Sequence, residues 1–108
     1  MDKLLLIHGD VGFYQADAIP QRAKKINVSK NFVIQHGESG HTHTLENECE
    51  VYIDEEISRM YFKETTEPVK VNHEEHGLQE VISPTKISYV DIEQEYDHET
   101  EEARMSRD

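Results

Sequence analysis

Apolar residues alternate with polar ones along most of the chain, and short polar breaks separate the alternating segments. Alternation with a period of two is typical of a strand that buries one face and exposes the other. The breaks are rich in Ser, Thr, Gly, Pro and acidic residues, which favour turns. The alternating segments are 31–36, 49–54, 59–64, 68–73 and 86–96. The pattern predicts an all-β domain of about six to eight short antiparallel strands, closed into a small β-barrel or folded as a sandwich.

Three other segments complete the organisation of the chain. Residues 3–20 are predicted to hold one or two more strands, with glycines marking a turn or bulge. Residues 18–30 form the longest loop-like segment. The last segment, 98–108, is polar and has almost nothing to bury, so it is predicted to be an acidic tail that is frayed or disordered. Residues 1–97 then form a single β-domain, since a chain of 108 residues is too short for two ordinary cores.

The net charge of the chain limits the classes of partner that it is expected to bind. The formal net charge is −12, from 23 acidic and 11 basic side chains. Nucleic acids and anionic membrane surfaces are both bound through Lys and Arg, so neither is an expected partner. Metal ions and proteins with a basic surface are favoured instead. Only 35% of the residues are apolar, so the core is expected to be small. A metal ion, or a second copy in a homo-oligomer, would add stability because it binds the folded form alone.

The cysteine content and the hydropathy of the chain indicate the cellular compartment of the protein. The single cysteine, Cys49, permits no internal disulfide. It alternates with Val51 and Ile53, which predicts a buried and inert thiol. No apolar run is long enough for a signal-peptide core or a membrane-spanning helix. These features predict a cytoplasmic protein.

Histidine clusters are the strongest chemical signal in the sequence. Five of the seven histidines fall in two groups, His36, His41 and His43, then His73 and His76. If the segment "HTHT" is extended, His41 and His43 project from one face of the strand and can reach one ion. His73 shares a strand face with Val69 and Val71, so it should follow two core residues inward. The two groups are therefore predicted to form the two halves of one site.

The residue types of this site suit a divalent transition metal. Imidazole and carboxylate ligands bind zinc, manganese, iron or nickel when three or four of them converge at about 2.0–2.3 Å. The predicted ligands are His41, His43 and His73, with His76, Glu46 or Glu48 competing for the remaining position. A closed set of four ligands would make the ion structural, whereas three ligands and an open position would permit hydrolytic or oxidative chemistry. The alternative interpretation is that both histidine groups are solvated turns paired with neighbouring glutamates.

The order of four segments resembles a family of short uncharacterised bacterial and phage-encoded proteins. The segments are "HGDV", "GESGHTHTLE", "HEEHGLQEVISPTKISYV" and "IEQEYD". That family has a QGDV-like opening, a GE-x-TGHAH segment, an HEEH segment followed by a Pro-Gly turn, and a Q-R-E-Y ending. This chain departs from the pattern at His8, Ser39, Thr42 and Thr85, and lacks the Arg of the ending. The resemblance covers nearly the whole chain and carries the two histidine groups, but it implies no reaction.

A second resemblance is to the cupins, small β-barrels with an HxH pair, a Glu several residues later and a further His. His41, His43 and Glu48 match the first cupin spacing, and the resemblance implies that these side chains converge on a metal. The second cupin motif places its Pro and Gly before the His, whereas Pro84 follows both His73 and His76 here.

Three functional hypotheses follow. The first is a small soluble metal-binding protein whose site is formed by the "HTH" and "HEEH" segments. The second is a non-catalytic acidic interaction protein, such as a phage or prophage accessory factor or a nucleic-acid mimic. The third is a small metal-dependent hydrolase or oxygenase, which requires the first hypothesis and an open coordination position. Whether the protein is an enzyme stays open at the level of the sequence.

Overall fold

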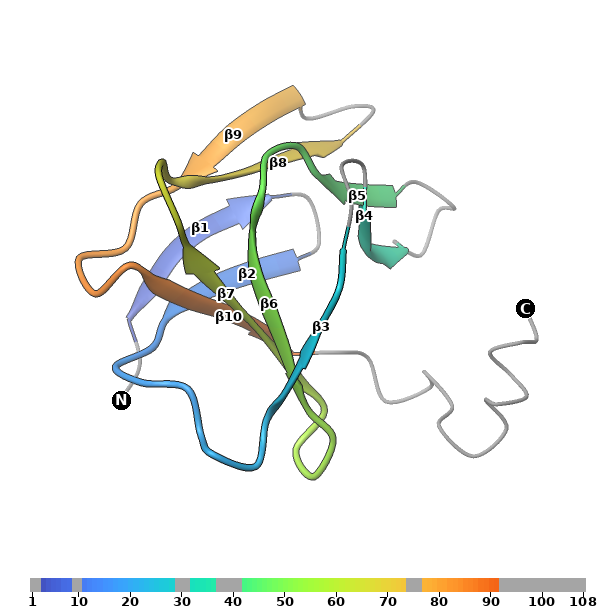
Figure 1. Ribbon diagram of the computed structural model, residues 1–108. Coiled ribbons are helices and arrows are strands. Elements are labelled where there is room, and N and C mark those ends of the chain that lie inside the picture. The colour runs from blue at the N-terminus through green and yellow to red at the C-terminus, as the bar shows by residue number, and fades with distance from the viewer. Residues whose placement is uncertain (1–2, 9–10, 29–31, 37–41, 74–76, 92–108) are drawn as a thin grey trace.

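The computed structural model describes residues 3–8, 11–28, 32–36, 42–73 and 77–91, with the backbone alone for His8, Gln35, His36, Thr42 and His73. Within these ranges the chain forms ten strands and no helix (Figure 1). The strands are β1 (Leu4–His8), β2 (Val11–Gln15), β3 (Lys24–Ile26), β4 (Phe32–His36), β5 (Thr42–Leu45), β6 (Cys49–Asp54), β7 (Arg59–Glu64), β8 (Val69–His73), β9 (Gly77–Val81) and β10 (Ile87–Asp91). The predicted tail, 98–108, lies outside the described residues.

The strands form two antiparallel sheets. One sheet has six strands in the order β1-β2-β10-β7-β6-β3, and the other has four in the order β4-β5-β8-β9. Neither sheet closes on itself, and the chain passes between them from β3 to β4, from β5 to β6, from β7 to β8 and from β9 to β10 (Figure 1). The all-β prediction is confirmed, and the open sheets favour the sandwich over the barrel.

Agreement between predicted and observed strands is closest where the alternation is strongest. The segments 49–54 and 59–64 are confirmed residue for residue as β6 and β7. The segment 18–30 was predicted to be a loop, and this is wrong in part because it contains β3. Strand β3 is only three residues long and is held by pairing with β6, with Lys25 opposite Tyr52. Pairing with a neighbour therefore adds short strands and raises the count above the predicted six to eight.

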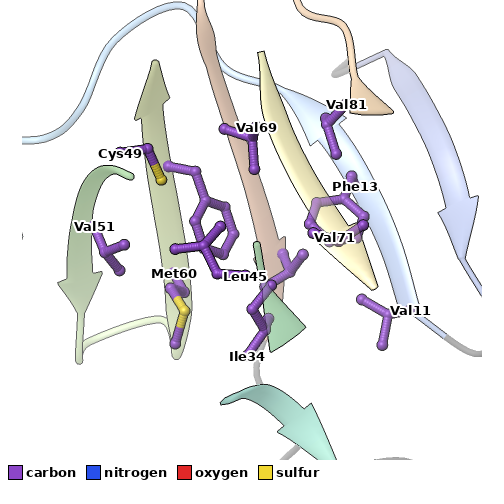
Figure 2. Packing of buried hydrophobic residues seen from close by; sticks show 12 residues of the cluster. Val11, Phe13, Ile34, Leu45, Cys49, Val51, Met60, Val69, Val71 and Val81 are labelled. Atoms are coloured by element: carbon purple, nitrogen blue, oxygen red, sulfur yellow. The ribbon is translucent and has the colours of Figure 1, made fainter. Parts of the chain in front are cut away.

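The main core lies between the sheets. Phe13, Val51 and Phe62 of the six-stranded sheet are buried, as are Leu45 and Val71 of the four-stranded sheet. Figure 2 shows side chains from both sheets gathered in the space between them. Apart from Glu64 at the end of β7, every second residue of β6 and β7 lies in or against this core, which is the physical reason that these strands were predictable from alternation.

The opposite face of the six-stranded sheet carries a row of four tyrosines. The strand registers place Tyr14 opposite Tyr89, Tyr89 opposite Tyr61, and Tyr61 opposite Tyr52. The rings of Tyr14 and Tyr89 stack with centroids 5.5 Å apart, and those of Tyr61 and Tyr89 lie 5.8 Å apart. The guanidinium of Arg59 sits 3.8 Å from the centroid of the Tyr89 ring. Such a row holds neighbouring strands together through cross-strand pairs.

Residues 16–23 pack against this tyrosine row and are fixed at both ends. At one end the hydroxyl of Thr85 donates to the carbonyl of Ala16, whose N–H donates to the carbonyl of Ile87. At the other end the Nε of Arg22 donates to the carboxylate of Asp54 at 2.7 Å. Ala16 is buried with Tyr61 and Tyr89, so this segment turns the outer face of the sheet into a second, smaller core.

Candidate metal site

Strands β5 and β8 bring one histidine of each group, His43 and His73, opposite one another. The two strands are hydrogen-bonded neighbours, and their register places His43 opposite His73, Thr44 opposite Asn72, and Leu45 opposite Val71. Directly opposed residues of antiparallel strands have Cα atoms about 4.5–5.5 Å apart. Residues thirty positions apart in the sequence thus become nearest neighbours across the sheet.

His43 is fully buried. Its exposed fraction is 0%, and it alternates with the partly exposed Thr44 and the buried Leu45. The imidazole therefore lies on the core side of the four-stranded sheet, on the same face as Leu45. A fully buried imidazole is shielded from water, which makes it a suitable ligand for an ion held inside the protein and unsuitable for one that must meet a soluble substrate.

The other predicted ligands are placed unequally. His41 and His76 lie outside the described residues, as does the neighbouring "EE" of the "HEEH" segment. His73 is placed through its backbone, which ends β8. Glu48 is exposed, in contrast to the fully buried His43. Among the described residues, no group of three or more His, Cys, Asp or Glu side chains is arranged to hold a metal ion.

Glu46 and Glu48, which compete for one ligand position, both line an open pocket. This pocket has a volume of about 430 Å³ and is bordered by Glu46, Asn47, Glu48, Thr66, Glu67, Lys70 and Leu78. The ammonium of Lys70 forms an ion pair with Glu67 at 3.1 Å. The pocket is therefore a polar and mainly acidic feature, and its lining residues are too dispersed in the sequence to predict it.

Asn47 fixes the wall of this pocket. Its side-chain amide donates to the carbonyl of Pro68 at 2.7 Å, and its side-chain oxygen accepts the N–H of Lys70 at 2.9 Å. The N–H of Glu46 donates to the carbonyl of Lys70 at 2.8 Å, which extends the β5–β8 pairing beyond the end of β5. An Asn in the "LENE" turn could have indicated such a side-chain link to the backbone, because Asn is a frequent turn residue for this reason.

Cys49 is buried at the start of β6, as predicted. Burial of the thiol, with smaller contributions from the charges of Glu50 and Glu64, raises its pKa to about 12. The thiolate is the reactive form of cysteine and the form that binds metals, so this residue contributes neither a nucleophile nor a ligand near neutral pH.

The Cys49 thiol is expected to make stability fall at alkaline pH. Because its pKa rises from 9.0 when free to about 12 in the fold, its contribution is complete below pH 9 and is lost as the pH rises toward 12. The slope in this window should approach about 1.4 kcal/mol per pH unit. Lysines and tyrosines also titrate there, so the measurement is the difference in free energy of unfolding between wild type and Cys49→Ala. A difference that is constant from pH 8 to pH 11 would contradict the assignment.

Among the described residues, no helix is long and apolar enough to cross a membrane.

Comparisons with known proteins identify the family of the chain. Searches of curated proteins and of solved structures find no match. A family model described as "Domain of unknown function (DUF8820)" matches residues 7–83, which include both histidine groups. Because this match spans more than half of the chain, the protein belongs to the DUF8820 family.

Proposed function

We propose that this protein is a histidine-ligated metal-binding domain in which His43 and His73 anchor one divalent ion. His41 and His76 are the further candidate ligands, because they flank the anchors by two and three residues in the sequence. Zinc suits this set best, since tetrahedral sites rich in imidazole are typical of zinc. The single observation that carries the proposal is the register that pairs His43 with His73.

Strand geometry supports a shared ion at this pair. Directly opposed residues of an antiparallel pair have Cβ atoms about 4.5–5.5 Å apart on one face of the sheet. Two imidazoles at that spacing can both reach an ion with zinc-to-nitrogen distances of about 2.0–2.1 Å. The complete burial of His43 favours a structural ion over a catalytic one, because a catalytic ion needs a coordination position open to substrate.

Glu48 is the predicted ligand that the geometry favours least, because its side chain is exposed and lines the acidic pocket. It therefore provides a useful control. Glu48→Gln removes a carboxylate that the sequence places near the histidines but should leave the bound metal in place.

Elemental analysis of protein purified without an affinity tag tests the proposal. We expect about one equivalent of metal per chain, lost in His73→Ala and reduced in His41→Ala and His76→Ala, and retained in Glu48→Gln. Circular dichroism should show that each variant keeps its β-structure, so that metal loss is not read from an unfolded chain. His41→Ala and His76→Ala keep the test decisive if the change at His73 destabilises β8.

Two further results bear on this proposal. A chelator should lower the melting temperature of the loaded wild type, because an ion that binds only the folded state stabilises it. Metal affinity should fall below about pH 6.5, where free imidazole becomes protonated. A protein that takes up no zinc, and whose melting temperature is the same with and without chelator, would contradict the proposal.

A further inference from the structure

Strand β9 is an edge strand without the usual protection of sheet edges. It pairs with β8 on one side, and among the described residues no strand is hydrogen-bonded to its other side, although β1 of the other sheet comes near it. Its register with β8 runs through five residue pairs without a bulge, and its sequence "GLQEV" contains neither Pro nor Lys. Natural edge strands are usually blunted by Lys, Pro or bulges, because unpaired backbone groups attract another strand. Leu78, Gln79 and Glu80 are all exposed along this edge.

Charge on the outer face of the four-stranded sheet is negative beside this edge. Leu78 and Glu80 share one face of β9, opposite Asn72 and Lys70 of β8. Leu78 is 59% exposed and also lines the acidic pocket. The carboxylates of Glu46 and Glu48 in that pocket make no ion pair with any described residue, and the one ammonium, that of Lys70, is already paired with Glu67.

We propose that β9 binds an extended segment of a partner protein in which an apolar residue and a Lys or Arg lie two positions apart, and so on one face of the added strand. The partner's backbone would add a strand to the four-stranded sheet, as in other cases of strand addition. An apolar side chain would cover Leu78, and basic side chains would pair with Glu80 and reach toward the acidic pocket. This inference rests on the β9 edge and the pocket, and it is independent of the metal site.

A second copy of the chain is a poorer occupant of the same edge. Two β9 strands placed side by side would bring two Glu80 carboxylates to one outer face, on molecules that each carry a net charge of −12. Like charges across a strand pair are destabilising. A basic segment removes this repulsion, whereas a second copy increases it.

Binding of synthetic peptides tests the proposal. The probe is a ten-residue peptide with the repeat Val-Thr-Lys-Thr (the Val-Lys peptide), which presents Val and Lys in turn on one face of the strand. It is compared with a peptide in which Glu replaces each Lys, and with a copy of the Val-Lys peptide N-methylated at every second residue. We expect the Val-Lys peptide to bind at least tenfold more tightly than either comparison peptide, because one lacks the charge match and the other lacks edge hydrogen bonds. In ¹⁵N-resolved NMR spectra, the largest shifts on binding should fall on the amides of Leu78, Gln79 and Glu80.

Variants of the protein locate the contact. The double change Glu48→Gln with Glu80→Gln should weaken the Val-Lys peptide by about three- to tenfold. Glu55→Gln, which removes one exposed carboxylate from the β6–β7 turn, should leave the affinity unchanged. If the N-methylated peptide binds as tightly as the Val-Lys peptide, strand addition is wrong. If the double variant keeps the wild-type affinity, the peptide does not bind at β9 and the acidic pocket. If light scattering shows a dimer, and dimer formation prevents the Val-Lys peptide from binding, then a second copy of the chain occupies the β9 edge and the proposed basic partner is wrong.

Discussion

Replacing Phe62 with alanine is expected to lower the free energy of unfolding by about 3–5 kcal/mol. Phe62 has an exposed fraction of 0% and lies on β7 between Val51 of β6 and Ser88 of β10. Its ring centroid is 6.0 Å from that of Phe13. The substitution removes most of a side chain from the centre of the main core and leaves a cavity that strands on both sides resist filling. Domains of this size have a total stability of about 5–15 kcal/mol, so the variant should be close to unfolding.

The measurement is urea-induced unfolding, with Phe32→Ala as the matched control. Phe32 on β4 is only partly buried at the edge of the same core, so the same truncation should cost about 1 kcal/mol. In thermal unfolding, the melting temperature of Phe62→Ala should fall by about 12 °C or more. Equal losses in the two variants would show that Phe62 does not occupy the centre of the core.

Replacing Arg22 with glutamine is expected to lower the free energy of unfolding by more than the loss of a surface ion pair does, because it leaves a buried carboxylate without its main partner. The carboxylate of Asp54 is 0% exposed, whereas the side chain of Arg22 is 48% exposed. Arg22 is therefore the main partner of the Asp54 charge. The backbone N–H of Glu56 also donates a hydrogen bond to this carboxylate, at 3.1 Å. Without the guanidinium, a buried negative charge lacks its main partner and residues 16–23 lose one of their two anchors.

A second substitution tests whether the buried charge of Asp54 causes the loss of stability in Arg22→Gln. Asp54→Asn added to Arg22→Gln removes the buried charge, so the double variant should recover more than half of the lost free energy of unfolding. Arg59→Gln is the control, because its partner Asp91 is 57% exposed and the pair lies at the surface. It should cost only about 1 kcal/mol, including the contact with Tyr89. An Arg22→Gln loss no larger than that of Arg59→Gln would contradict the role given to Asp54.

The sequence predicts strands well where core residues recur at every second position. Strands β6 and β7 were predictable to the residue because Cys49 and Val51, and then Met60 and Phe62, follow this spacing. Strand β9 was not predicted, because four of its five residues are exposed and it carries no alternating burial. Strand β3 was missed for a similar reason, since it exists through pairing with β6 and not through its own pattern. Edge strands depend on their neighbours, and a single-chain pattern does not contain that information.

The tyrosine row was missed because its members are distributed over four strands. Tyr52, Tyr61 and Tyr89 occupy the strand positions that alternation assigns to solvent, and only the register aligns them. A sequence signal did exist, since β7 and β10 carry apolar residues on both faces, which is typical of a strand covered on both sides. The covering segment, residues 16–23, could not be assigned to that face from composition.

For the candidate site, strand parity could predict which histidines share a face, but the pairing of β5 with β8 required the fold. His43 and His73 could each be assigned to a strand face from their own neighbours. Their direct opposition depends on the register of two strands separated by β6 and β7 in the chain. A shift of one residue in that register would place one histidine on the opposite face.

Anomalous X-ray diffraction at the zinc absorption edge, from crystals of zinc-loaded protein without a tag, would show whether His43 and His73 share one ion. We expect one strong peak on the core side of the β5–β8 pair, about 2.0–2.1 Å from an imidazole nitrogen of both His43 and His73. No zinc at this position, or zinc bound only at surface carboxylates such as Glu48 while His43 is hydrogen-bonded within the core, would contradict it.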